Sequence, residues 1–170
     1  MTLIVKNSQR LVKFNTDLLK KHVILLRKLF DVSSFDLAVV CENDKTVQYL
    51  NKTYRHVDAP TDVLSFPFLE IIKPGELPPI NNPEEKILGD IVLGLPYINR
   101  TCNENSEKLE EILPVMVTHG ICHLIGYDHE EESQWKHMDS FDDYRDNFRK
   151  SVDDLYENDS DDSFKRRFMR

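Results

Sequence analysis

The sequence lacks an apolar run long enough to cross a membrane, and it has few cysteines and a minority of basic residues. Cys41, Cys102 and Cys122 are scattered and odd in number, so no disulfide framework is predicted and a reducing compartment is favoured. The chain has 22 Lys and Arg against 30 Asp and Glu, a net charge of −8. This balance argues against a protein that coats nucleic acid indiscriminately, although a local basic patch remains compatible with it.

The N-terminal region is locally basic, with five Lys or Arg before His22 and one acid, Asp17. This bias fits an organelle-targeting segment, and it equally fits a strand at 3–7 followed by a basic helix. Both interpretations stay open on the sequence alone.

Apolar spacing along the chain predicts strands that alternate with helices, in an α/β or α+β sheet with crossovers. Pro67 ends the third strand and indicates an edge strand, while 73–86 reads as irregular. A long apolar helix is expected from Ser106, and Pro114 lies inside it. The proline predicts either a kink at that point or a helix that begins only at Leu113. The expected strands are 3–7, 35–41, 63–66 and 87–93, with 35–41 buried on both faces; the expected helices begin near 16, 44, 96, 106 and 130. Residues 1–150 are expected to form one domain, and 151–170 a charged, disordered tail.

One stretch carries half of the six histidines. His119 and His123 are four apart, which places both imidazoles on one face of a helix. Gly126 stands where a helix would end, so the chain can turn and bring His129 to the same point. Three imidazoles around a zinc-like cation leave a fourth position for water, which is typical of a catalytic site. Such a cation makes hydroxide available near neutral pH.

The spacing matches the long-zincin pattern H-E-x-x-H-x-x-G-x-x-H, except that Gly120 replaces the general-base Glu of a protease. Arg55 is a candidate phosphate clamp for a phosphodiester, or else a salt-bridge partner of Asp58 or Asp62. The predicted groups around the site are Asp62 and Ser65, on and beside the third strand, and Asp128, which could orient a ligand imidazole or cap the turn.

Three motifs together resemble the YbeY family. They are HGICHLIGYDH at 119–129, YRHVDAPTDVLSFP at 54–67 and LGDI at 88–91. The resemblance implies a small mixed four-stranded sheet with about five helices, and a metal site on a central buried helix and the following turn. It also implies one zinc per chain on His119, His123 and His129, with Arg55 in a catalytic or RNA-contacting role.

The resemblance implies a zinc-dependent endoribonuclease that matures small-subunit rRNA at its 3′ end and acts in ribosome quality control, with metal-bound hydroxide attacking the phosphodiester. The implied partners are rRNA, the small ribosomal subunit and a small-subunit ribosomal protein. The form Cys122-His123-Leu124 resembles animal homologues, which favours mitochondria over the cytoplasm. Two alternatives remain: a non-catalytic ribosome assembly factor with a structural zinc, and a metalloprotease-like relative without its Glu.

Overall fold

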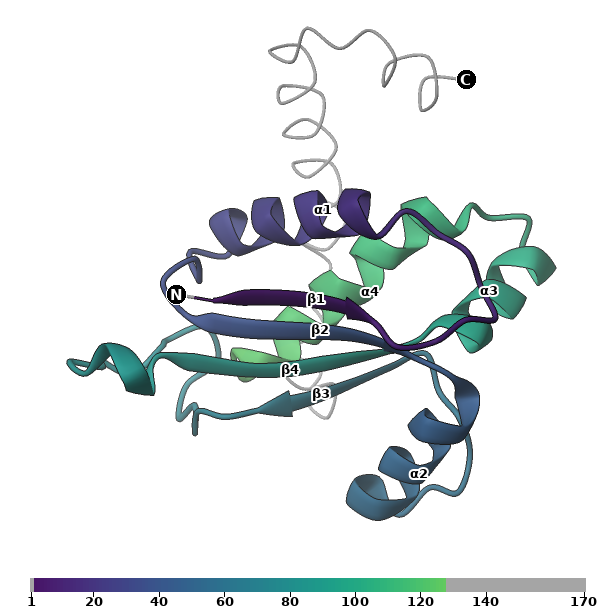
Figure 1. The fold of residues 1–170 in the computed structure, drawn as a ribbon. Coiled ribbons are helices and arrows are strands. Elements are labelled where there is room, and N and C mark those ends of the chain that lie inside the picture. The colour runs from purple at the N-terminus through teal and green to yellow at the C-terminus, as the bar shows by residue number, and fades with distance from the viewer. Residues whose placement is uncertain (1, 128–170) are drawn as a thin grey trace, which may run out of the picture. The chain divides into compact units, whose positions relative to one another are not determined.

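The computed structural model of this chain describes residues 2–127. Within them, a four-stranded sheet has the order β1-β2-β4-β3 (Figure 1). The strands β1 (Leu3–Asn7), β2 (Asp36–Glu42) and β4 (Ile87–Gly94) run parallel, and β3 (Val63–Pro67) pairs antiparallel with β4 at the edge. The mixed sheet, the α+β class and the edge position of β3 are therefore confirmed.

Four α-helices accompany the sheet in the described residues: α1 (Thr16–Leu29), α2 (Asp44–Arg55), α3 (Leu95–Glu104) and α4 (Leu109–Leu124). The 73–86 segment contains only a short 3₁₀ turn, η1 (Pro83–Glu85). The helix expected from residue 130 and the tail at 151–170 lie outside the described residues. No helix in the part of the chain that is described is long and apolar enough to span a membrane.

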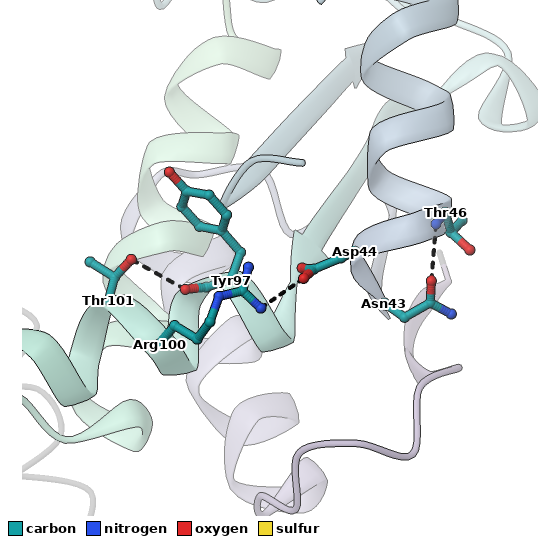
Figure 2. A network of polar contacts seen from close by, with 6 residues as sticks. All are labelled: Asn43, Asp44, Thr46, Tyr97, Arg100 and Thr101. Atoms are coloured by element: carbon teal, nitrogen blue, oxygen red, sulfur yellow. Dashed lines mark hydrogen bonds and ion pairs between the residues drawn. The ribbon is translucent and has the colours of Figure 1, made fainter. Parts of the chain in front are cut away.

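Local capping explains where α1 and α2 begin. The side-chain oxygen of Asn15 accepts a hydrogen bond from the Leu18 N–H at 3.0 Å. Asn43 accepts one from the Thr46 N–H at 2.9 Å (Figure 2). In each case the side chain satisfies a backbone donor that the first helical turn leaves without a partner.

An ion pair joins the start of α2 to α3. Nη1 of Arg100 lies 2.7 Å from a carboxylate oxygen of Asp44, and its guanidinium carbon lies 5.7 Å from the Tyr97 ring centroid (Figure 2). Asp44 also stands in the first turn of α2, where a negative charge is favourable. This contact fixes the start of α2, whose last turn carries Arg55.

The two faces of the sheet are covered by different helices. Ile91 of β4 faces α4 at Gly120, whereas Val92 packs with Leu64 and with Val47 of α2. Figure 1 shows α1 and α4 on one side of the sheet and α2 on the other. The candidate metal ligands and Arg55 therefore come from opposite sides of the sheet.

The expected burial of 35–41 on both faces is wrong. In β2 only alternate residues, Leu37, Val39 and Cys41, are fully buried, and those between them are half-buried. The reason is that α2 packs over β3 and β4, at Leu64 and Val92. It therefore covers that face of β2 incompletely.

The helix expected from Ser106 begins three residues later than predicted. Ser106 has φ +56°, a left-handed conformation that cannot continue a helix. Helix α4 starts at Leu109 after Lys108 and contains Pro114 in its second turn. A start at Leu113 is therefore wrong, and Pro114 removes a backbone donor inside the helix.

His22 on α1 gives the fold a specific pH dependence. Burial lowers its pKa from 6.5 to about 4, so between these two pH values the unfolded chain binds a proton that the folded chain does not. The free energy of unfolding should therefore fall by about 2 kcal/mol between pH 7.5 and pH 5 on this account. Urea unfolding of wild type and His22→Gln at both pH values should show the loss in wild type and a smaller one in the variant. His56→Asn, at an exposed histidine, is the control, and an equal pH response of His22→Gln and wild type would contradict the prediction.

Candidate metal centre

His119 and His123 point to one place on α4. Their Nε2 atoms are 3.0 Å apart, and their ring centroids are 4.5 Å apart with the planes at 80°. Two nitrogens bound at about 2.0–2.1 Å to one tetrahedral cation would lie roughly 3.3 Å apart. The pair therefore fits two ligands of a single zinc-type ion.

The histidines lie on the more open flank of α4. Val117, Ile121 and Leu124 are fully buried, while His119 and His123 are half-buried. Because α1 packs beside α4 over the β1 end of the sheet (Figure 1), we infer that the histidine flank faces the β3 end. Within residues 2–127, that side is the one on which the imidazoles are less covered.

A third ligand is not placed by the described residues. Both His129 and Asp128 lie outside them, and within residues 2–127 no cluster of three or more His, Cys, Asp or Glu forms. Gly126 does adopt the left-handed conformation expected for the turn, with φ +94°. Helix α4 ends at Leu124, two residues earlier.

The glycine in place of the protease Glu has a packing reason. A Cβ at Gly120 would lie 2.8 Å from Cδ1 and 2.9 Å from Cγ2 of Ile91. Position 120 therefore faces the β4 strand at a distance that allows no side chain without movement of Ile91. A carboxylate here would enter the core instead of the open flank that carries the histidines.

Ser65 connects β3 to α4 on one side and to Arg55 on the other. The Ser65 hydroxyl donates to the Gly120 carbonyl oxygen at 3.3 Å, and Ser65 is buried. The exposed Arg55 guanidinium donates from Nη2 to the Ser65 carbonyl oxygen, also at 3.3 Å. Two hydrogen bonds thus separate Arg55 from the residue that follows His119. Asp58, one of the expected salt-bridge partners of Arg55, pairs with Lys52 at 2.9 Å.

The ladder between β3 and β4 shows which backbone groups of β3 face its free edge. Ladder bonds to β4 use the Asp62 carbonyl, which accepts from Gly94 at 2.7 Å, and the Phe68 N–H, which donates to Leu88 at 3.1 Å. Because such bonds alternate along an antiparallel strand, the residues whose backbone groups face outward are Val63, Ser65 and Pro67.

Each of these outward positions offers less to an added strand than an open edge would. The Asp62 carboxylate accepts from the Val63 N–H at 2.7 Å. Arg55 occupies the Ser65 carbonyl, and Pro67 has no N–H. The edge therefore lacks several of the groups that a peptide needs in order to add as another strand. Asp62 itself lies at the start of β3, where its side chain also accepts from the Thr61 hydroxyl at 3.1 Å.

The irregular segment before η1 packs against the end of α4, a contact that the sequence does not predict. The Gly75 N–H donates to the Ile125 carbonyl at 2.9 Å. A Cβ at Gly75 would lie 2.6 Å from the Tyr127 hydroxyl, and one at Gly126 would lie 2.7 Å from the Ile71 side chain. Gly75 is thus in contact with a side chain at the end of α4, and Gly126 with a side chain of the irregular segment. Both glycines have a positive φ, a backbone conformation that glycine tolerates.

Cys122, between the two histidines in sequence, belongs to the core. It is 6% exposed, and burial raises the pKa of its thiol to about 12. A thiol with so high a pKa stays protonated near neutral pH and is a poor metal ligand. Cys122 is therefore a small buried residue of the core.

Comparison with known proteins places these motifs in a family. A family model described as "Endoribonuclease YbeY" matches residues 4–145. The chain is similar to a Homo sapiens protein named "Endoribonuclease YbeY", with 41% identity over 138 residues that cover 81% of this chain and 82% of the relative. A protein of the same name from Aquifex aeolicus is 34% identical over 142 residues, covering 81% of this chain and 87% of that one.

The fold also has a solved counterpart. The solution structure of TM1509 from Thermotoga maritima superposes with a TM-score of 0.56 and covers 95% of this chain and 98% of that one. Its sequence identity to this chain is 22%. The likeness therefore supports the α+β architecture of the described elements.

Proposed function

Because the chain belongs to the YbeY endoribonuclease family, a family of metal-dependent hydrolases, we propose that it cuts RNA with one zinc ion. The observation that carries the proposal is the pair of imidazole nitrogens 3.0 Å apart on α4. Arg55, held on the neighbouring edge of β3, is the second component. A pair of metal-ligating imidazoles on α4 and a guanidinium on the adjoining β3 edge are groups suited to an anionic phosphodiester.

Each residue has a separate role in this proposal. His119 and His123 hold the zinc ion together with His129. When bound, such an ion supplies a nucleophile by lowering the pKa of a water molecule. Arg55 binds the RNA phosphate, since a guanidinium can donate two parallel hydrogen bonds to phosphate oxygens. Ser65 is a positioning residue, because its hydroxyl and its carbonyl contact α4 and Arg55 respectively.

The two remaining acids have supporting roles. Asp62 holds the first residue of β3 through the Val63 N–H and so fixes the edge on which Arg55 rests. We assign Asp128 to the orientation of a ligand imidazole, a role that carboxylates often have at zinc sites.

The proposed substrate is the small-subunit rRNA near its 3′ end, with a small-subunit ribosomal protein as the partner. What supports this is membership of the family and the word endoribonuclease in the names of the human and Aquifex relatives. We place the action in mitochondria, with the cytoplasm as the alternative, on the similarity to the human relative and the form Cys122-His123-Leu124.

A non-catalytic assembly factor with a structural zinc is the second candidate. It is favoured by the net charge of −8 and by the glycine that follows His119 where a general base would stand. A protease is disfavoured by the contact of Gly120 with Ile91 and by the occupied edge of β3.

Chelation and substitution of Arg55 test the proposal. Zinc-loaded protein should cleave a defined 3′ fragment of small-subunit rRNA, lose that activity with a chelator and regain it when zinc is restored. Arg55→Ala should lower kcat/KM by about 10- to 100-fold, the effect of losing a charge-assisted hydrogen bond to substrate. The measurement is the initial rate of cleavage across a range of RNA concentrations.

Lys52→Ala is the matched control, because Lys52 is an exposed cation in the same last turn of α2 and is paired with Asp58. It should change kcat/KM by less than about 2-fold, since exposed ion pairs contribute little. Cleavage that persists after complete zinc removal would contradict the proposal. Ribosome assembly that proceeds normally with Arg55→Ala, without any RNA cleavage by wild type, would favour the assembly factor.

A further inference from the structure

A ring beside Arg55 is held in place and yet open to solvent. Tyr54 is 63% exposed, and its ring centroid lies 5.2 Å from that of Phe66, with the planes at 71°. Phe66 in turn packs against the buried cluster of Val47, Leu64 and Val92. The core therefore fixes the position of Phe66, and the contact with Phe66 fixes the Tyr54 ring. Most of the Tyr54 surface stays exposed to solvent.

A third ring continues the row along β3. Phe68 is 62% exposed, and its N–H extends the ladder to the Leu88 carbonyl at 3.1 Å. Phe68 directly follows β3, and strand alternation carried one residue past its end places Phe68 on the same side as Phe66, at a spacing of about 6.8 Å. We call Tyr54, Phe66 and Phe68 the aromatic platform. It lies on the α2 side of the sheet, and Arg55, the residue after Tyr54, donates to the carbonyl of Ser65, the residue before Phe66.

We propose that the aromatic platform binds bases of single-stranded RNA that flank the bond to be cut, an inference that rests on the proposed function. Aromatic rings stack on any base, so they hold RNA without reading its sequence. Arg55 is the residue after Tyr54, and its charge complements the phosphate between two such bases. Lys52 in the same turn is already paired with Asp58, so we assign the phosphate contact to Arg55.

The path of the RNA follows from the two faces of β3. The platform lies on the α2 face, whereas the Ser65 hydroxyl contacts α4, which carries the histidines, on the other face. Arg55 contacts the free edge between them. RNA would therefore cross this edge, with flanking bases on the platform and the phosphate to be cut on the histidine side.

Asp90 supports the same path. It is exposed and lies opposite Phe66 in the β3–β4 register, on the side away from the free edge. Its carboxylate disfavours a phosphate chain that runs across β4. The RNA is thus directed away from β4 and toward the β3 edge that it would cross. Because the platform touches bases away from the reacting bond, its loss should raise KM and leave kcat nearly unchanged.

Binding to metal-free, full-length protein tests the platform without cleavage. The probes are a fluorescein-labelled unstructured RNA of twelve nucleotides and the same backbone with abasic sites. Wild type should prefer the probe with bases, and Tyr54→Ala should weaken its binding by about 5- to 100-fold and remove the preference. Tyr54→Phe, which keeps the ring, should bind as wild type does. Fluorescence anisotropy gives the Kd values, and circular dichroism shows that each variant is folded.

Tyr49→Ala is the matched control. Tyr49 is 67% exposed on the same helix, but it lies five residues before Tyr54 and so projects to another face of α2. The inference would be overturned if Tyr49→Ala and Tyr54→Ala weakened binding equally, or if wild type bound both probes alike. An unchanged Kd of Tyr54→Ala would also overturn it, and would indicate that the platform binds a protein partner. Because the probes are read without metal, these results are independent of whether zinc-loaded protein cleaves RNA.

Discussion

His123→Ala should lose zinc and RNA cleavage together while the protein remains folded. His123 is half-buried on the open flank of α4, so its removal leaves no core cavity and should change the free energy of unfolding of the metal-free protein by less than about 1 kcal/mol. Loss of a group that merely supports a ligand costs about 10- to 100-fold in metal affinity, so loss of the ligand itself should exceed that. Competition with a chromogenic chelator measures the affinity, and the rRNA fragment reports cleavage.

His56→Asn is the control for this experiment. His56 is exposed at the end of α2 with φ +61°, a conformation that asparagine accepts. It should keep both zinc and activity. A His123→Ala protein that retains one zinc per chain and cleaves RNA would refute the site. If zinc removal instead unfolds wild type, the metal is structural, because structural zinc contributes directly to folding free energy.

Features set by nearby residues could be predicted from the sequence. The four-residue spacing of His119 and His123 predicts that both imidazoles share one face of a helix, and their Nε2 atoms lie 3.0 Å apart. The starts of α1 and α2 near residues 16 and 44 were predicted, because the caps that set them, Asn15 and Asn43, act only on the following turn. The edge position of β3 was likewise indicated by Pro67, which follows from the chemistry of one residue.

Features that depend on distant residues could not be predicted. The sequence gives no sign that the segment around Gly75 closes on Gly126 and Tyr127, because the contact joins residues about fifty apart. The late start of α4 depends on Ser106 adopting φ +56°, which helical periodicity does not register. The link from Arg55 through Ser65 to Gly120 needs the strand order and the helix position together.

The packing of Gly120 against Ile91 explains why glycine stands at this position, and Gly120→Glu should fail to fold stably. Its Cβ would lie 2.8–3.0 Å from three carbons of Ile91, and overpacking of this kind costs about 1–3 kcal/mol. The carboxylate would then be buried at the cost of several kcal/mol more. The sum of about 4 kcal/mol or more is a large part of the 5–15 kcal/mol that typically stabilises a domain. Urea unfolding measures the loss.

The zincin-like spacing makes this result informative about function. If Gly120 marked a lost protease, Gly120→Glu would fold, keep zinc and cut a peptide substrate. We expect none of these outcomes, because position 120 faces Ile91 of β4 and not the histidine flank. A stable Gly120→Glu protein with peptidase activity would restore the protease interpretation.

A double-mutant cycle separates the clash from the charge. Gly120→Ala alone combines about 1 kcal/mol of helix propensity in its favour with the contact against Ile91, so it should be neutral or destabilising. In an Ile91→Ala background the three contacting carbons are absent, and the same Gly120→Ala change should stabilise the protein by about 1 kcal/mol. A change of sign between the two backgrounds would identify Ile91 as the reason for the glycine. Equal effects of Gly120→Ala in both backgrounds would show that some other contact excludes a side chain at position 120.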